Sequence, residues 1–312
     1  MTPQQVLHAL ESVRRAQSDG RYAPHKPLLL LLALARVQRG EGRLMTLAEV
    51  EPKLKEMLQA FAPTRSANRS HYPYWHLRSD AGRNLWDVTG PASLVNRPAG
   101  ATPNLTELRQ PGVQAGFTQD VFQALQAQPG LIGEAAERVL DAYFPETLRD
   151  DILAATGLDL DKPPEIWEKD TPYHVISTRR RKRDPAFRER VLRAYEWRCC
   201  VCGFDLRVGH IPAGLEAAHI QWHNVGGPDE EPNGLSLCAL HHKLFDLGAF
   251  TIEPGGHRVV FSHHAVAGDK GSVGELRYHG RPMLGPTQRR LWPAPVYLEW
   301  NRRNVFKAPA RA

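Results

Sequence analysis

The fold-deciding stretch of this protein is residues 199–246, CCVCGFDLRVGHIPAGLEAAHIQWHNVGGPDEEPNGLSLCALHHKLFD. It opens with the pair Cys199 and Cys202 in Cys-x-x-Cys spacing and closes with Cys238 and His241 in Cys-x-x-His spacing. Two such pairs, each on a tight turn, supply four ligands to one tetrahedral Zn²⁺. The spacing therefore predicts a structural zinc site, and the long insert predicts that something else folds between the pairs.

Two alternatives to this ligand set stay open in the sequence. His242 is the alternative fourth ligand, with His241 facing outward, but the spacing of the first pair favours His241. The other alternative is a set of buried cysteines without metal, which two pairs around one segment argue against. Cys200 lies between ligands, and we expect it to pack or to have no role.

The placement of the cysteines also indicates a compartment. All four follow residue 198, whereas a disulfide framework spreads cysteines along a chain. The longest apolar run, Leu28–Ala35, is too short to span a bilayer and lies too deep to be a signal peptide. We therefore expect a cytoplasmic bacterial protein with no membrane partner.

Between the zinc pairs the sequence resembles the HNH nucleases, from about Phe187 to Phe261. The resemblance rests on His219, Asn233 and His242, in that order, with the zinc pairs outside them. It implies the ββα-metal fold, in which a hairpin, a loop and a helix surround one catalytic metal.

The chemistry of phosphodiester hydrolysis suggests a role for each residue. The reaction needs a deprotonated water, a clamp on the phosphate and help for the leaving oxygen. Neutral imidazole is a good base near pH 7, so we expect His219 to be the general base. We expect His242, with Asp246 four residues further on the same helical face, to hold Mg²⁺, Mn²⁺, Co²⁺ or Ni²⁺. The resemblance implies that Asn233 orients the base and pins its loop.

One position departs from the family pattern. Many HNH nucleases place an acidic metal ligand directly before the catalytic histidine, where this chain has Ala218. Glu216 is close by, but we expect it to have the wrong strand parity to replace that ligand. Each of these residues could also have a purely structural role. For example, His219 could be a core histidine and Asp246 a salt-bridge partner. Together, the residues favour a nuclease.

Length and composition predict an α+β multidomain protein. At about 150 residues per domain, 312 residues suggest two domains. The 40 Lys and Arg against 34 Asp and Glu leave a formal charge of +6, a mild bias toward an anionic partner. We expect a mostly helical domain at 1–155, a proline-rich linker at 156–183 and a second domain at 184–312. The linker ends in a basic tract whose members are Arg179, Arg180, Arg181, Lys182 and Arg183.

Two interpretations of this basic tract stay open. It is either a run of solvated charges or a segment that contacts DNA phosphates without sequence specificity.

The first domain is expected to be helical except in its middle. The expected helices run from Pro3 to about Arg15 with Thr2 as the cap, from Pro27 to Gly40, from the Thr46 capping box to about Phe61, and several over 118–155. Aromatic residues at 74–77 and 85–88 predict a hairpin, and 90–116 reads as an irregular segment. In the second domain, Asp184 is expected to cap a helix that runs to about Trp197.

Two segments of the first domain can be interpreted either as ordinary structure or as a binding site. They are YAPHKPLLL at 22–30 and HYPYWHL at 71–77. From their residues alone they read as a capped core helix and an aromatic hairpin. In this order they resemble the sulfur-binding domain of phosphorothioate-dependent restriction endonucleases, which precedes an HNH module. In that domain an apolar cavity prefers sulfur, which is larger, softer and less hydrated than oxygen.

The resemblance assigns seven residues to DNA. It places His25 and Lys26 at the DNA backbone, Tyr72 and Pro73 in the apolar wall, His76 at its lining, and Arg109 and Gln110 at base edges. Some relatives have a small residue where this chain has His76, which changes the shape of the cavity.

Together these features predict a type IV restriction endonuclease that reads phosphorothioated double-stranded DNA and cuts nearby. Since both strands must be cut, we expect a homodimer. One alternative is an HNH nuclease that reads another mark or unmodified DNA. The other is a zinc-containing DNA-binding regulator without catalysis.

Overall fold

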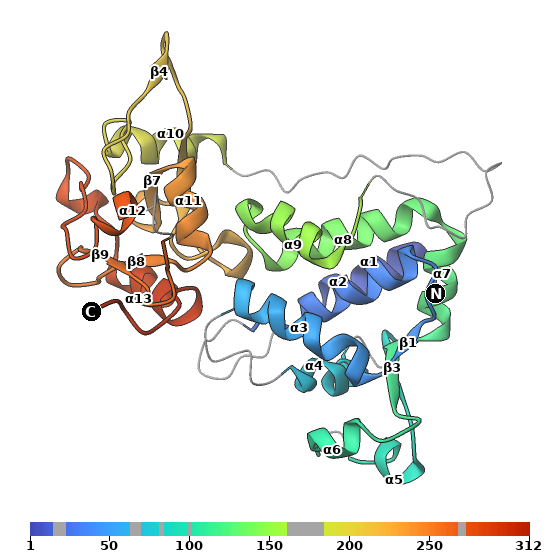
Figure 1. Ribbon diagram of the computed structural model, residues 1–312. Helices are drawn as coiled ribbons and strands as arrows, with labels where there is room; N and C mark the ends of the chain where they lie inside the picture. The colour runs from blue at the N-terminus through green and yellow to red at the C-terminus, as the bar shows by residue number, and fades with distance from the viewer. Residues whose placement is uncertain (15–22, 63–69, 81–83, 99–100, 161–183, 268–272) are drawn as a thin grey trace. The chain divides into compact units, whose positions relative to one another are not determined.

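The computed structural model describes residues 1–14, 23–62, 70–80, 84–98, 101–160, 184–267 and 273–312 (Figure 1). The chain divides into two compact units, Met1–Arg180 and Arg181–Ala312. Both units combine helices with small sheets, which confirms the α+β class expected from the sequence.

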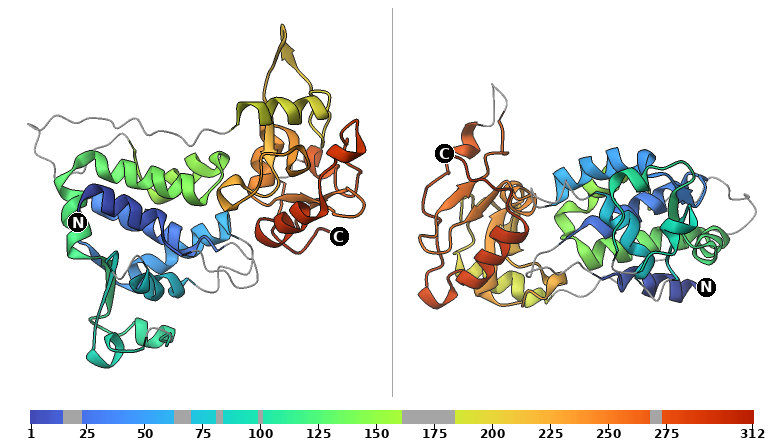
Figure 2. Two further views of the ribbon diagram at one scale, coloured as in Figure 1. Left: turned by 180° about the vertical axis from the view of Figure 1, so that it is seen from behind. Right: turned by 90° about the horizontal axis from the view of Figure 1, so that it is seen from below.

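The first unit is built around helix α2, His25–Gln38. Its leucine run is fully buried because neighbours cover every side: α2 packs against α3 (Leu47–Phe61) and α8 (Pro129–Tyr143), and α1 (Pro3–Glu11) covers α8 (Figure 2). The remaining described helices of this unit are α4 (His71–His76), α5 (Ala92–Val95), α6 (Leu105–Leu108), α7 (Gln119–Ala127) and α9 (Arg149–Thr156), with short 3₁₀ turns at Leu77–Ser79 and Glu146–Leu148.

Local signals predicted the starts of α1 and α3. The Thr46 hydroxyl accepts from the Glu49 amide at 3.3 Å, and the Glu49 carboxylate accepts from the Thr46 amide at 2.6 Å, so the capping box is formed. Helix α2 begins at His25, two residues earlier than expected. Proline in the first turn is tolerated there because its missing N–H would have no partner in the helix.

The predicted hairpin is wrong. Residues 71–76 form α4, which packs against α2, and strand β2 (Trp86–Thr89) pairs with β3 (Gln114–Phe117) instead. The predicted irregular segment 90–116 therefore holds α5, α6 and the start of β3, and β1 (Leu44–Met45) completes an antiparallel sheet in the order β1-β3-β2. The aromatic residues still meet, because the Trp86 indole donates to the Tyr74 carbonyl at 3.1 Å.

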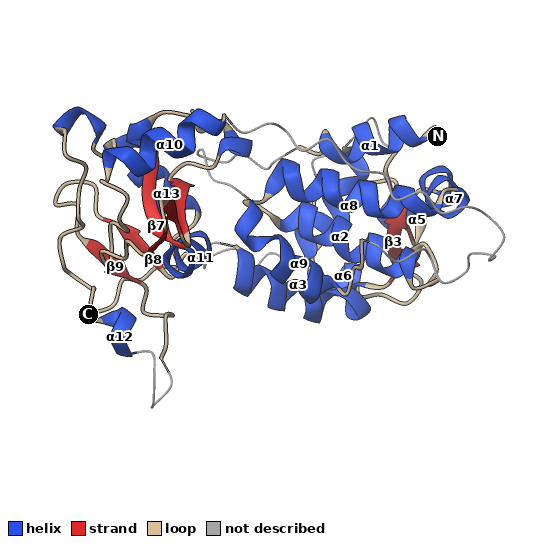
Figure 3. Ribbon diagram, turned by 90° about the horizontal axis from the view of Figure 1, so that it is seen from above, coloured by secondary structure: helices blue, strands red, loops and turns tan. Residues whose placement is uncertain are grey.

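The second unit places a hairpin between helices. Strands β6 (Leu215–His219) and β7 (Gly234–Cys238) pair antiparallel, α11 (Ala239–Asp246) follows β7 directly, and α10 (Pro185–Ala194) packs on both strands (Figure 3). Asp184 caps α10 as expected, but the helix ends at Ala194, before two residues with positive φ. The other described elements are β4 (Arg207–Val208), β5 (Ile211–Pro212), β8 (Phe250–Ile252), β9 (Val259–Phe261), α12 (Val273–Leu276), α13 (Pro295–Asn304), and 3₁₀ turns η5 (His223–Val225), η6 (Glu231–Asn233) and η7 (Arg289–Leu291).

Candidate functional site

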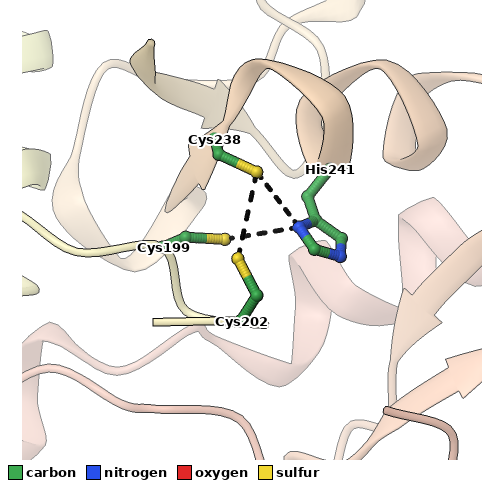
Figure 4. Close-up of side chains that lie close together, drawn as sticks. All are labelled: Cys199, Cys202, Cys238 and His241. Carbon is green, nitrogen blue, oxygen red and sulfur yellow. Dashed lines mark hydrogen bonds between the residues drawn. The ribbon is translucent and has the colours of Figure 1, made fainter. Parts of the chain in front are cut away.

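The two zinc pairs of the sequence meet in one cluster. The ligand atoms of Cys199, Cys202, Cys238 and His241 all lie within 4.8 Å of one another (Figure 4). His241 Nδ1 lies 3.1 Å from the Cys238 sulfur and 3.6 Å from the Cys199 sulfur. Three sulfurs and one imidazole nitrogen, converging from two turns, are a donor set that fits Zn²⁺.

Local backbone geometry builds the first turn of the cluster. Gly203 has a φ of +76° and its amide donates to the Cys199 carbonyl at 2.9 Å, which closes the turn around the cysteine pair. This left-handed conformation favours glycine, so the sequence CVCG encodes the turn. Cys200 lies in the same turn but is fully buried in the hydrophobic core, outside the cluster.

His241 is held on its far side by groups that the sequence did not indicate. Its Nε2 lies 2.8 Å from the Glu275 carboxylate of α12, outside hydrogen-bond geometry, and the rings of Phe250 and Tyr278 stand edge-on to it. Burial lowers the pKa of His241, but the cysteine sulfurs outweigh it and raise the pKa to about 12. A carboxylate behind a ligating histidine fixes the ring orientation, so Glu275 suits that role.

His219 lies at the end of β6, opposite Gly234 of β7. Its ring stacks on Phe187 of α10 at 4.2 Å between centroids, and its Nε2 lies 2.6 Å from Asp229 Oδ1. Sequence reasoning missed Asp229, because nothing in a spacing of ten residues across a loop indicates a contact.

Asn233 pins the loop that follows His219. Its side chain is fully buried, accepts from the Gln221 amide at 2.8 Å, and donates to the carbonyls of Gln221 and Pro228 at 3.0 and 2.9 Å. Each side-chain contact is therefore made to the backbone of the loop.

His242 lies between two carboxylates. Its Nδ1 is 2.6 Å from Glu216 Oε2, and its Nε2 is 3.3 Å from Asp246 Oδ2. Burial lowers the pKa of His242, but Asp246 and Glu216 outweigh it and raise the pKa to about 9. The hydrogen bond from His242 lowers the pKa of Glu216 in turn.

The expectation that Glu216 has the wrong strand parity is wrong. Glu216 and Ala218 are two residues apart on β6 and thus share a face, and α11 packs against this strand. The Glu216 carboxylate consequently reaches His242 although the chain has alanine before His219.

The candidate DNA-reading residues of the first unit come from neighbouring elements. His25 and Lys26 begin α2, and Tyr72, Pro73 and His76 lie on α4, which packs against α2. Tyr72 is 38% exposed and its ring lies 5.6 Å from that of His76, whereas Pro73 is buried in the helix. Tyr72 and Pro73 thus lie within a helix and not at a hairpin entrance, which corrects the expected setting of these two residues.

The charges on this surface are partly neutralised. Lys26 Nζ lies 2.5 Å from Asp80 Oδ2, and the Asp80 side chain is only 2% exposed. His76 Nε2 lies 3.0 Å from the Thr102 hydroxyl, and burial together with the Lys26 charge lowers the pKa of His76.

The two base-reading candidates lie just after α6. The exposed Arg109 is tied to the buried Glu51 of α3 at 2.5 Å, and Gln110 is also exposed. The basic tract 179–183 lies outside the described residues. Among the helices that the structure describes, none combines the length and the apolar character needed to cross a membrane.

Comparison with known proteins divides the chain in the same way. Residues 3–161 match the family model of the ScoMcrA-like DNA sulfur-binding domain, and residues 199–253 match an HNH endonuclease model. A search of curated proteins found no match.

Solved structures with similarity to the chain include three structures of two McrA proteins, ScoMcrA and SprMcrA. The sulfur-binding domain of ScoMcrA, complexed with phosphorothioated DNA, is 23% identical and covers 49% of this chain and 94% of its own, with a TM-score of 0.37. The corresponding domain of SprMcrA, also complexed with phosphorothioated DNA, is 22% identical over 52% and 97%, with a TM-score of 0.42. The phosphorothioation-dependent type IV restriction endonuclease ScoMcrA is 24% identical over 47% and 28%, with a TM-score of 0.38.

Proposed function

Because this chain belongs to the ScoMcrA-like DNA sulfur-binding domain family, we propose that it is a restriction endonuclease that binds phosphorothioated double-stranded DNA and hydrolyses phosphodiester bonds near the modified site. The observation that carries the proposal is one chain with both a match to a sulfur-binding reader and an HNH hairpin-helix beside a Cys₃His cluster. We assign residues 1–155 to the reader, 156–183 to a linker and 184–312 to the nuclease. Cutting both strands suggests a homodimer.

The reader surface has the properties that sulfur recognition requires. Tyr72 offers an exposed aromatic face beside the half-buried His76, and the Lys26 charge is largely matched by Asp80. A weakly charged, partly apolar surface gains little from a strongly hydrated phosphate oxygen. It gains more from a sulfur atom, because less water is lost from sulfur on burial.

We predict that the chain binds a duplex with one phosphorothioate at least about tenfold more tightly than the matched duplex with oxygen, a difference of about 1.4 kcal/mol. The reason is the lower desolvation cost of sulfur at Tyr72 and His76. Fluorescence anisotropy at one fixed salt concentration measures both affinities, since phosphate contacts depend on salt. The control is Tyr72→Ala, which should reduce the preference while leaving affinity for unmodified DNA within about twofold. Equal affinity for the two duplexes would exclude a sulfur reader and favour an HNH nuclease with another target.

Each candidate nuclease residue has a separate role in phosphodiester hydrolysis. His219 takes a proton from the attacking water, and Asn233 holds the loop that carries the neighbouring groups. His242, Glu216 and Asp246 offer imidazole nitrogen and carboxylate oxygen, which fit Mg²⁺, Mn²⁺, Co²⁺ or Ni²⁺. A divalent cation bound there supplies positive charge for the scissile phosphate and the leaving 3′ oxygen.

The two carboxylates beside His242 differ in a way that separates their roles. The Asp246 side chain is 2% exposed, and its second oxygen accepts from the Trp222 indole at 3.1 Å. The Glu216 side chain is 44% exposed, so a metal and DNA can reach it. We therefore assign Glu216 and His242 as metal ligands, and Asp246, which the sequence predicted to be a ligand, as the group that orients His242.

We predict that Glu216→Gln weakens Mn²⁺ binding more than Asp246→Asn does. Loss of an orienting partner costs about 10- to 100-fold in metal affinity, and loss of a charged ligand costs more. Calorimetric titration of Mn²⁺ into the zinc-loaded chain, without DNA, measures both variants. The reverse order would assign Asp246 as the ligand and Glu216 as its support.

A further inference from the structure

The loop between β6 and β7 contains a carboxylate, that of Asp229, which contacts the ring of His219. Asp229 Oδ1 lies 2.6 Å from His219 Nε2, and the His219 side chain is only 10% exposed. A carboxylate accepts hydrogen bonds and cannot donate one, so the ring nitrogen that faces it carries the proton.

Asp229 is held in place by contacts on both sides of it. Asn233 donates to the Pro228 carbonyl at 2.9 Å, and Arg190 of α10 donates to the Asp229 carbonyl at 2.8 Å. The same arginine lies 3.3 Å from Glu231, two residues further along. The loop backbone is thus anchored to α10 and to Asn233, and this anchoring places the Asp229 side chain.

The middle of the loop allows this approach only with glycine. Gly226 has a φ of +90°, and a Cβ atom on Gly227 would lie 1.9 Å from the Gln221 carbonyl oxygen. The chain therefore turns back tightly at Gly226 and Gly227, which returns Asp229 to the histidine ring ten residues after His219.

We propose that Asp229 is a positioning residue for His219: it holds the imidazole with Nε2 protonated, so that Nδ1 is the atom that takes a proton from the attacking water. The inference rests on the proposed nuclease function. In the step, the water oxygen bonds to phosphorus as its proton passes to Nδ1, the bond to the 3′ oxygen breaks, and the leaving oxygen takes a proton from solvent.

Two features separate this role from simple packing. Phe187 already supports the face of the ring by stacking, whereas Asp229 contacts the ring edge, where it selects a tautomer. The charge of Asp229 also stabilises the imidazolium that forms when His219 accepts the proton. Among the described residues, contacts also place near this pair the titratable His223, whose Nε2 lies 3.8 Å from Asp229 Oδ2, and the charged Arg190 on the loop backbone.

The variant Asp229→Asn tests the inference on the full-length, zinc-loaded chain. We expect kcat for DNA cleavage to fall about 10²-fold, as for loss of correct proton transfer by a general base. The acidic limb of the kcat/KM profile should move to lower pH, because the charge that stabilises the imidazolium is gone. The matched control is Asp205→Asn, an exposed carboxylate of the same unit, which should leave rate and profile unchanged.

Nitrogen NMR of the His219 ring gives a second readout that needs no DNA. We expect wild type and Asp229→Glu to show a protonated Nε2 and Asp229→Asn to show a mixture of tautomers. If Asp229→Asn fails to fold, the comparison of Asp229→Glu with Asp229→Ala replaces it. A protonated Nε2 and DNA cleavage in Asp229→Glu, but not in Asp229→Ala, would show that the carboxylate is the group required. A folded Asp229→Asn chain with unchanged tautomer and pH profile overturns the inference. A wild-type chain that cuts no DNA counts against the nuclease proposal alone, because the ring nitrogens still report on Asp229.

Discussion

Removal of metal from the Cys₃His cluster is expected to unfold residues 181–312 and to leave the first unit folded. Structural zinc sites of this type contribute about 10–16 kcal/mol of apparent binding free energy. The whole stability of a domain is only about 5–15 kcal/mol. The cluster joins the turn at Cys199, which precedes β6, to the end of β7 and the start of α11, so its loss detaches that turn from the ββα motif. The first 198 residues contain no cysteine, which makes the first unit an internal control.

The expected result is measured by adding a chelator and following limited proteolysis with mass spectrometry. Fragments from residues 181–312 should disappear while a fragment covering residues 1–160 persists, and Zn²⁺ should restore protection. Cys238→Ser should behave like the chelated wild type. Cys200→Ala, at the buried cysteine outside the cluster, should retain one zinc per chain by elemental analysis. A second unit that stays folded and resistant without zinc would show that the hydrophobic core alone supports it.

Replacement of His219 by alanine is expected to abolish cleavage while DNA binding persists. A general base contributes about 10²–10⁴-fold to rate. We expect kcat to fall at least about 10³-fold, with the affinity for phosphorothioated DNA within about twofold of wild type, because the reader is a separate unit.

The measurement uses a phosphorothioated duplex with Mg²⁺, Mn²⁺, Co²⁺ or Ni²⁺ in turn. His263→Ala, an exposed histidine of the same unit, serves as the matched control and should cut at the wild-type rate. Cleavage by His219→Ala at the wild-type rate would remove His219 from the mechanism. Wild-type binding without cleavage under all four metals would instead identify a DNA-binding regulator.

Local sequence signals predicted the parts of the fold that depend on neighbouring residues. The Thr46 capping box and the Asp184 cap were predicted because both bonds close within a few residues. The predicted hairpin at 74–88 was wrong because aromatic residues, although enriched in strands, also occur in buried helices, and here residues 71–76 pack as a helix against α2. The pairing of β2 with β3 spans the segment from Gly90 to Val113, and no local pattern encodes it.

In the candidate site, too, contacts between neighbours in the chain were predictable from the sequence and long-range contacts were not. The three-residue spacings predicted the two ligand pairs, because each pair forms a turn whose geometry is local. The pairing of β6 with β7 and the hydrogen bond from the Cys200 amide to the Ser236 carbonyl bring the two turns together. The carboxylates that face the imidazoles are Asp229, Glu216, Asp246 and Glu275. Only Asp246 was expected, since it lies one helical turn from His242.

The sequence by itself therefore determined the ligands of the cluster, the order of the HNH residues and the helices with local caps. Only the tertiary structure decided which carboxylate contacts which histidine. Asp229 reaches His219 through a loop anchored on α10, and Glu216 reaches His242 because α11 packs on β6. The physical reason is that a turn or cap closes among neighbours in the chain, whereas these contacts depend on the packing of whole elements against one another.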